Sequence, residues 1–521
     1  MTQNNILIKS TKFFVVLAIL VGIVLFFQTT VDDSYICFRY GYNLIHHGIW
    51  NWNADNERIE AYTSFTYMIL SVFPPLLNIQ PQIFFKIFTF IFFLLILRRI
   101  YALVDNKKYA WFIIFFVVAN WHTHVHIYAG LETIFWFYLL IETFSILYKE
   151  DFSNKQQSKL WLLALLFPLT RPEGAVFSMF IFVYVFFKNN RKIYFPTLIL
   201  FALIGGIYFI LRYKYFGLLL PLSFYHKSIG NNMGFLGILF NTYTAWQYLF
   251  LLIFLLFQVK KQNKLAFYFI LTVLFVYYAF YGTSALLMNY ANRFAFQLFY
   301  PAIIFALIML AQKASEKINK KVHIVMLVFI ALIVYKGFTD KTPLQFGTIK
   351  ENMLFTAYMH KTHFNTGNQI AALKNNKIKV LMGDAGVLPY LANTKCYDPY
   401  GLADVYLSTK HIDRAYFDKM DADLLILSGF FNEETIHKDI TNVGKIYQYI
   451  SEPNSNYTYL YKFTTAQNNK YAMFFYVKNN SKYKIEIIEA LDKAKIHHDN
   501  FKITPKDFLT FQYLNNYKVN D

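Results

Sequence analysis

Long runs of apolar residues recur through the first two thirds of the chain and stop near residue 338. A run of about 20 apolar residues is long enough to cross a bilayer as a helix. The runs predict about 11 membrane-spanning helices, at 13–30, 83–103, 109–122, 131–148, 159–171, 174–188, 193–212, 234–258, 265–288, 294–311 and 322–339. Residues 1–339 are therefore predicted to form a polytopic α-helical membrane domain.

One further apolar run, from Ser64 to Leu77, is short for a crossing and contains Pro74 and Pro75. If it crossed, the basic pair Arg98 and Arg99 would face the outer side, against the usual charge bias. We therefore predict that residues 64–79 lie along the outer interface, within a first outer loop of residues 31–82. A re-entrant hairpin would leave the same residues outside.

The pattern changes after residue 339, where shorter apolar segments alternate with polar ones. Residues 349–376 are predicted to be helical, and residues 378–382, 423–427, 457–463 and 472–477 are predicted to be strands. Such alternation is typical of an α/β domain. Residues 340–521 are thus predicted to form a water-soluble domain with a core of its own.

The composition agrees with a membrane protein, since 56% of the 521 residues are hydrophobic and 20% are aromatic. The net charge of +19 could suggest nucleic acid as a partner. However, the N-terminal segment and alternate connectors carry 19 basic residues against four acidic ones, and so account for +15 of that charge. Basic connectors on one side mark the cytoplasmic side of a membrane protein. We therefore expect no nucleic-acid partner.

This charge pattern predicts a cytoplasmic N-terminus and an extracytoplasmic C-terminal domain. We expect a multi-pass protein of the bacterial cytoplasmic membrane. The first apolar run, Phe13 to Phe27, has no small-residue cleavage site after it, so it is expected to be an uncleaved anchor. Cys37 and Cys396 are the only cysteines, which excludes a disulfide framework and leaves a single bridge open.

Polar and aromatic side chains crowd the stretch from Asp32 to Thr63 more densely than a simple connector needs. The stretch opens on two adjacent carboxylates, Asp32 and Asp33. Such a pair could bind a divalent cation, or one member could deprotonate an attacking hydroxyl, because a neighbouring like charge raises proton affinity. The same pair could instead cap a helix on a solvated loop.

The other predicted outer connectors also carry ionisable side chains. Arg171 lies two residues before Glu173 at the end of a span. It either pairs with Glu173 as a structural clamp or holds an anionic group of a substrate. The same two readings apply to Arg293, Lys227 and His226.

Three further features carry less chemistry. His122, His124 and His126 alternate, which suits a metal in a strand but not in a helix, and no cysteine or carboxylate completes a zinc site. Glu142 is predicted to lie within the membrane and to pack against a polar partner. Gly383 to Gly386 is predicted to be a tight turn between a strand and a helix rather than a phosphate loop.

The run DDSYICFRYGYNLIHHGIWNWN, with ERIEAYTSFTYMIL after it, resembles the first outer loop of GT-C-type glycosyltransferases that use polyprenyl-phosphate donors. Within them it is most similar to the terminal arabinofuranosyltransferases of cell-wall arabinan synthesis. Residues 130–133, 170–174, 383–386 and 398–402 add to the resemblance. Ala61 and Asn56 stand where that family usually has glycine. These two changes affect backbone shape, so they bear on sugar specificity more than on activity.

The resemblance implies a lipid-phosphate sugar as donor. It assigns Asp32 and Asp33 to an acidic motif that serves the acceptor or a metal, so a divalent cation (Mg, Mn or Ca) is a candidate cofactor. Asp384 and Asp398 belong to its C-terminal motifs. Together with outer placement, it points to a set of candidate substrate or donor-phosphate ligands: Arg39, Tyr40, Asn43, Glu57, Arg58, Glu60, Tyr62, Arg171, Glu173, His226, Lys227 and Arg293.

We therefore expect a glycosyltransferase that moves a sugar, such as arabinofuranose or another pentose, from a polyprenyl phosphate to a cell-surface glycan or lipid. Two other classes compete with this expectation. A lipid or oligosaccharide transporter would need polar residues along a path through the bilayer, where only Glu142 and Lys86 stand out. An O-antigen-type ligase would use cations rather than the acidic pair.

Overall fold

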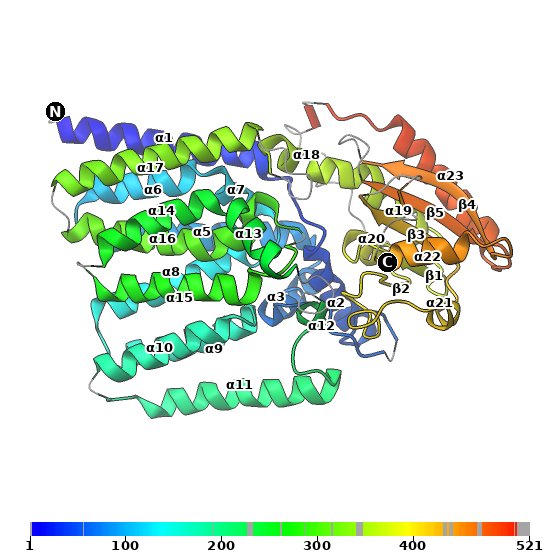
Figure 1. Ribbon diagram of the computed structural model, residues 1–521, viewed down its shortest axis with the longest axis horizontal. Helices are drawn as coiled ribbons and strands as arrows, with labels where there is room; N and C mark the ends of the chain where they lie inside the picture. The colour runs from blue at the N-terminus through cyan, green and yellow to red at the C-terminus, as the bar shows by residue number, and fades with distance from the viewer. Residues whose placement is uncertain are drawn as a thin grey trace.

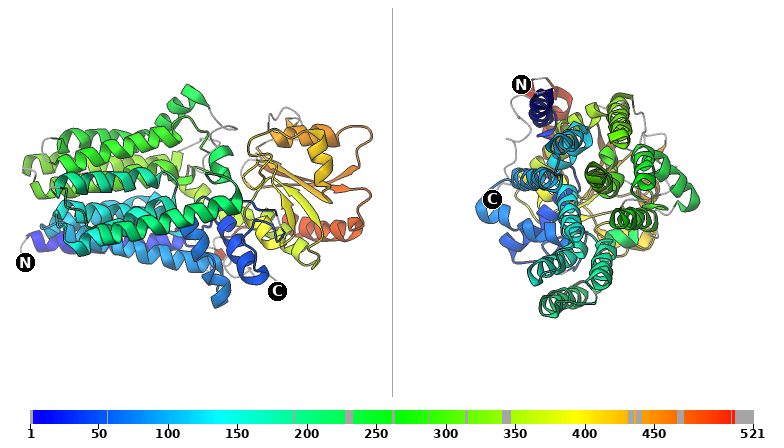
Figure 2. Two further views of the ribbon diagram at one scale, coloured as in Figure 1. Left: turned by 90° about the horizontal axis from the view of Figure 1, so that it is seen from below. Right: turned by 90° about the vertical axis from the view of Figure 1, so that its left-hand side faces the viewer.

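The computed structural model describes residues 3–55, 57–189, 191–226, 233–260, 263–286, 288–313, 316–339, 347–430, 435–436, 441–465, 471–504 and 506–507. A bundle of long helices is followed by an α/β domain at one of its ends, here called the domain end (Figures 1 and 2). The long helices of the bundle are α1 (Gln3–Phe26), α5 (Pro81–Leu103), α6 (Lys107–Ala119), α8 (Thr133–Lys149), α9 (Asn154–Thr170), α10 (Gly174–Lys188), α11 (Phe195–Phe216), α14 (Trp246–Val259), α15 (Lys264–Tyr281), α16 (Arg293–Lys313) and α17 (Glu316–Thr339).

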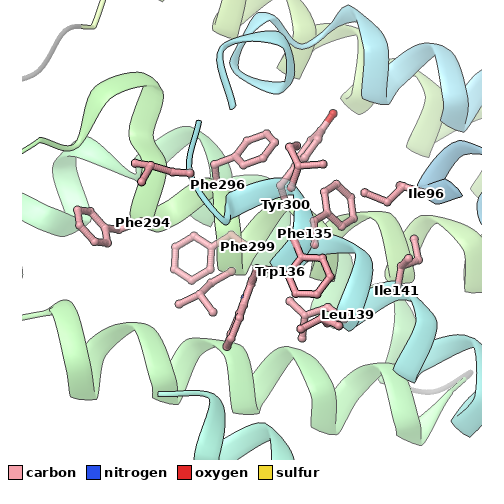
Figure 3. Close-up of a cluster of buried hydrophobic side chains, with 14 of the residues drawn as sticks. Ile96, Phe135, Trp136, Leu139, Ile141, Phe294, Phe296, Phe299 and Tyr300 are labelled. Atoms are coloured by element: carbon pink, nitrogen blue, oxygen red, sulfur yellow. The ribbon is translucent and has the colours of Figure 1, made fainter. Parts of the chain in front are cut away.

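Helix α16 forms the centre of the bundle and is almost wholly buried. Its aromatic side chains pack against α5 and α8 in a tight cluster that includes Phe296, Tyr300 and Trp136 (Figure 3). Helices α1 and α11 lie at the periphery and bury little of their surface. Apolar side chains on an outer helix are expected where lipid is the solvent.

Each predicted span coincides with one long helix, except that 234–258 is divided. There α13 (Gly234–Thr244) meets α14 at an angle of 78°, and α7 (Trp121–Tyr128) bends away from α6 by 66°. Among the described residues, five helices are long and apolar enough to cross a membrane, or up to seven if each bent pair is one span. The fold is thus a helical membrane bundle, and the number of 11 crossings stays a prediction.

The predicted basic connectors gather at one end of the bundle. The turns after α5, α8, α10, α14 and α16 all lie at the end far from the α/β domain, together with the start of α1 (Figure 1). The domain end instead carries short elements: α2 (Ser34–His47), α3 (Phe65–Leu70), α4 (Phe73–Leu77), α7, α12 (Leu222–Tyr225), α13 and η2 (Tyr290–Asn292). Helices α3 and α4 are each too short to cross a bilayer.

The C-terminal domain is a sheet with helices on both faces. Its elements are α18 (Ile349–Met359), η3 (His360–Phe364), α19 (Asn365–Ala371), β1 (Lys379–Met382), α20 (Val387–Ala392), β2 (Lys395–Tyr397), α21 (Arg414–Met420), β3 (Leu424–Gly429), α22 (Asn442–Ile450), β4 (Tyr457–Thr464), β5 (Ala472–Lys478) and α23 (Lys484–Asn500). The strand order is β2-β1-β3-β5-β4, with β1 parallel to β2 and β3, and β5 antiparallel to β3 and β4.

Two apolar layers hold this domain together. One face of the sheet packs against α19, α20 and α23, and the other packs against α21 and α22. Strand β3 is buried along its whole length, as an uninterrupted apolar strand between two helical layers should be. The four predicted strands are present, and β2 is an additional one.

Candidate active site

The first outer loop and the turn before α8 are joined at the domain end of the bundle. The backbone N–H of Val31 donates to the carbonyl of Ala129 over 3.1 Å. Next to this bond Gly130 has a φ of +81°, in the left-handed region that glycine tolerates best. Glu132 lies two residues after Gly130. The fold therefore brings the acidic start of the loop, Asp33, close to a second carboxylate, that of Glu132.

Asp33 occupies the N-cap position of α2 but makes no side-chain capping bond. Its carboxylate faces Arg293 instead, with 3.6 Å between Asp33 Oδ2 and Arg293 Nη1. Arg293 reaches Glu132 with its other terminal nitrogen, over 3.2 Å. The Asp33 side chain is 30% exposed whereas that of Arg293 is 7% exposed. Asp33 is therefore the accessible end of a buried row of charges.

The row continues through Arg171, which is buried and fully engaged. Its Nη1 pairs with Glu132, its Nε donates to Glu173 over 2.5 Å, and its Nη2 donates to the hydroxyl of Tyr281 over 2.8 Å. Three carboxylates thus share two guanidinium groups. This arrangement favours the structural clamp over the donor-phosphate role that was also predicted for Arg171, since each nitrogen of its guanidinium has a protein partner.

The charges of this row stabilise each other. Arg293 and Arg171 both pair with the buried carboxylate of Glu132 and so offset the cost of its burial. Arg293 differs from Arg171 in one respect: its Nε is buried and has no hydrogen-bond partner among the described residues. Arg293 therefore keeps one donor without a protein partner among the described residues, and that nitrogen is enclosed.

Asp32 turns away from this row and contacts the C-terminal domain. Its Oδ1 accepts a hydrogen bond of 2.8 Å from the backbone N–H of Val387, the first residue of α20. Burial, together with the charge of Asp384, raises the pKa of Asp32 to about 7. The two adjacent carboxylates therefore face different surroundings, and Asp32 caps a helix that is 355 residues away.

Asp384 lies in the turn that leads into α20. His363 binds it through Nε2 over 2.9 Å, and the hydroxyl of Tyr471 donates to both carboxylate oxygens over 2.5 and 2.6 Å. Burial would raise the pKa of Asp384, but His363 outweighs it and lowers that pKa, while Asp384 raises the pKa of His363 against the effect of burial. His363 and Tyr471 were not among the residues predicted from sequence.

Several predicted ligands of the donor are engaged in packing the first outer loop. Arg39 is buried and donates to the carbonyls of Trp52, Thr394 and Pro389. Tyr40 and Asn43 likewise bind backbone atoms within residues 51–61. Because these contacts hold the loop together and tie it to the C-terminal domain, we leave Arg39, Tyr40 and Asn43 out of the proposed donor site.

The second half of the loop is tied to α11 and to β2. Glu60 pairs bidentately with Arg212, and Tyr62 is buried beside Tyr40. Arg58 lies over the ring of Tyr215 at 4.6 Å. Glu57 is half-exposed, 4.0 Å from Lys395 of β2. Of the four predicted ligands in this half of the loop, Glu57 and Arg58 stay accessible. They do not belong to the row of charges that ends at Asp33.

The remaining candidates are scattered. Asp398 accepts from the backbone N–H groups of Tyr400 and Ala403 in its own turn, and burial raises its pKa to about 7. This places Asp398 in a structural turn. His226 ends α12 and is partly exposed. Lys227 lies outside the described residues.

The buried groups that suggested a metal or a polar path have protein partners. His122, His124 and His126 lie on helix α7, so their rings diverge and bind Tyr248, Val118 and Ala291 respectively. Glu142 pairs with Arg99 and Lys159, which confirms the polar partner expected for it. Lys86 donates to the carbonyls of Thr29 and Tyr128. Cys37 and Cys396 are both free.

The acidic pair does not by itself fit a divalent cation. Hard cations such as Mg and Ca need several oxygen ligands converging on one point. Asp32 is directed to Val387 and Asp33 to Arg293, and the described residues contain no cluster of three or more His, Cys, Asp or Glu suited to a metal. No step proposed below depends on a cation.

Glu132 and Tyr281 are two further site residues that were not predicted from sequence. The signal for Glu132 was present, because the stretch 130–133 resembles the glycosyltransferase pattern. Tyr281 carried no such signal: it ends an apolar helix, α15, and only its hydrogen bond with Arg171 reveals it.

No protein-family model and no curated protein matches this sequence. Solved structures do match. ArnT from Cupriavidus metallidurans bound to undecaprenyl phosphate has a TM-score of 0.54 at 12% identity, covering 89% of this chain and 97% of that chain. Its apo state gives 0.53 at 11% identity over the same shares. An Archaeoglobus fulgidus oligosaccharyltransferase complex with Zn and sulfate gives 0.40 at 12% identity, over 89% of this chain and 73% of that chain. This chain therefore has the fold of ArnT, a helical bundle followed by an α/β domain.

Proposed function

We propose that this protein is a membrane glycosyltransferase that transfers a sugar from a polyprenyl phosphate to an acceptor hydroxyl on the outer face of the cytoplasmic membrane. The observation that carries the proposal is the pair formed by accessible Asp33 and buried Arg293 at the domain end of the bundle. The ArnT structure that shares the fold holds undecaprenyl phosphate, which supports a donor of that class. Arabinofuranose or another pentose is the sugar that the first outer loop favours.

The chemistry divides between these two side chains. The acceptor oxygen attacks the anomeric carbon, the bond between that carbon and the phosphate oxygen breaks, and the phosphate leaves with the bonding electrons. Asp33 takes the proton of the acceptor hydroxyl, and general-base assistance of this kind is worth ~10²–10⁴ in rate. Arg293 binds the departing phosphate through the guanidinium that faces Asp33.

The phosphate needs further positive charge, because three carboxylates already share Arg171 and Arg293. His226 and Lys227 are further candidates from the sequence, since they belong to another predicted outer connector. The acceptor is a cell-surface glycan or lipid, in keeping with the predicted position of the C-terminal domain outside the membrane.

The rival functions find less support in the described residues. A transporter needs a polar route across the bundle, but Glu142 is neutralised by Arg99 and Lys159 far from the domain end. Lys86 is held by two backbone carbonyls. An O-antigen-type ligase would not need the carboxylate of Asp33.

The proposal is tested with the full chain in liposomes, supplied with synthetic undecaprenyl-phosphate-linked pentoses and hexoses and with neutral oligosaccharide acceptors. Release of undecaprenyl phosphate together with a gain of one sugar by the acceptor is the expected result. Asp33→Asn keeps the shape of the side chain and should lower transfer at least ~100-fold at normal abundance.

The matched control is Asp418→Asn, which removes an exposed carboxylate from the C-terminal domain. It should transfer as the wild type does. Absence of transfer from every lipid-phosphate sugar, or normal transfer by Asp33→Asn, would refute the proposal.

A further inference from the structure

The turn from Gly383 to Gly386 is fitted to the first outer loop. A Cβ atom on Gly386 would collide with the backbone carbonyl and with the carboxylate of Asp32. The next residue, Val387, donates its N–H to Asp32 Oδ1 over 2.8 Å. The approach of Gly386 to the Asp32 carbonyl is a contact between main-chain atoms. Rotation of side chains alone therefore does not separate the two segments.

Asp384 fixes this turn from the other side. His363 of η3 binds it over 2.9 Å, and Tyr471, which directly precedes β5, donates to both of its oxygens. The rings of His363 and Tyr471 also lie 6.3 Å apart and almost parallel. Two other segments of the C-terminal domain therefore converge on the Asp384 carboxylate, and the turn that carries it contacts Asp32.

Other contacts keep the two parts of the chain in register around this point. Thr30 donates its N–H to the hydroxyl of Thr356 over 2.9 Å. Asn53 makes two hydrogen bonds of 3.0 Å with the backbone of Cys396. The C-terminal domain thus forms hydrogen bonds with the chain both before and after the acidic pair.

From this geometry we propose that Asp32 and Asp384 are positioning residues, and that the C-terminal domain sets the direction of Asp33 by seating Asp32 on the turn before α20. Asp32 is the residue before Asp33, so fixing its carboxylate and carbonyl fixes where α2 begins. Asp33 then meets Arg293 rather than the turn. The role of Asp33 in this proposal rests on the proposed function. The contact of Asp32 with Gly386 and Val387, here called the seat, is a property of the folded chain and does not depend on that function.

Substitution of Asp32 separates a positioning role from a chemical one. The amide oxygen of Asp32→Asn can still accept from Val387 N–H, and the neutral amide removes the repulsion from Asp384. Asp32→Asn should therefore keep transfer within about tenfold of wild type, while Asp32→Ala should lose about 10–100-fold in kcat with little change in KM for the donor. If Asp32→Asn is as inactive as Asp32→Ala, Asp32 acts in the chemistry and the proposal is overturned.

Amide hydrogen exchange of the full chain in detergent micelles reports the seat without any assay of activity. Exchange of residues 387–392 should be at least about tenfold faster in Asp32→Ala and in Gly386→Ala, because both open the contact with α20. Tyr471→Phe should accelerate it less. The matched control is Gly206→Ala on α11, where a Cβ atom meets nothing within 4 Å.

These measurements distinguish failure of the seat from failure of the proposed function. Unchanged exchange at residues 387–392 in both Asp32→Ala and Gly386→Ala would overturn the seat, whatever the wild type transfers. Faster exchange in a protein that transfers no sugar would support the seat and refute the glycosyltransferase.

Discussion

Arg293 Nη1 lies 3.6 Å from Asp33 Oδ2, although the two residues belong to the central helix of the bundle and to the first outer loop. The distance leaves the pair looser than the contacts between Arg171 and its carboxylates. Arg293 and Arg171 are therefore expected to respond differently to substitution.

Arg293→Gln should lower transfer about 100-fold, because it removes the charge proposed to receive the phosphate. Arg293→Lys should recover part of the loss, since it restores the charge without the planar fork. The measurement is kcat and KM for a lipid-phosphate pentose in liposomes. Equal activity of Arg293→Gln and wild type would exclude Arg293 from the site.

Arg171→Ala should act on stability. It leaves Glu132 and Glu173 buried and short of a partner, and breaking a buried pair in this way costs about 3–5 kcal/mol. The expected result is a lower melting temperature in detergent and lower membrane abundance. Arg414→Ala is the control, because its pairs with Asp418 and Glu452 are exposed. A folded but inactive Arg171→Ala would place Arg171 at the donor.

The pairing of His363 with Asp384 predicts a pH-dependent gain in stability. Asp384 raises the pKa of His363 despite burial. The stabilisation is therefore complete below the ordinary histidine value of about 6.5 and is lost as the pH rises through the raised value. The melting temperature of the wild type should exceed that of His363→Gln most near pH 6, and the difference should shrink toward pH 9. A constant difference would mean that His363 is not charged in the folded protein.

The predicted orientation can be tested by fusing a reporter at Asn189, which follows α10, and another at Asn454, between α22 and β4. The turn after α10, which begins at Asn189, lies at the end of the bundle far from the C-terminal domain (Figure 1). The two reporters should give opposite signals, with Asn189 in the cytoplasm. Matching signals would contradict the placement of Asp33 at the outer face.

Hydropathy predicted the helices of the bundle because lipid-facing and core-facing positions are both apolar, so a span shows as one continuous run. It did not predict the bend at Asn120, whose side chain caps α7 by accepting from His122 N–H. That stretch fell between the predicted spans 109–122 and 131–148 and was therefore assigned to a connector. The sheet of the C-terminal domain was predicted from its apolar strands, and only the short β2 was not.

The acidic pair could be found from sequence, but not the separate surroundings of its two members. Asp32 is bound by Val387 and Arg39 by Thr394, each more than 350 residues along the chain, and no local pattern encodes such contacts. For the same reason Arg39 was expected at the donor. Local motifs identified which residues matter, whereas tertiary packing decides whether a side chain is accessible or buried.

The backbone just before Arg293 carries a conformational cost, because two consecutive residues there are left-handed. Ala291 and Asn292 have φ values of 45° and 51°, and the carbonyl of Ala291 accepts from Nε2 of His126. A left-handed alanine costs about 1–2 kcal/mol. Ala291→Gly should relieve it, and would let Arg293 sample directions other than that of Asp33. The left-handed backbone thus lowers the stability of the fold at this position, and it fixes the direction of the Arg293 guanidinium in the absence of a ligand.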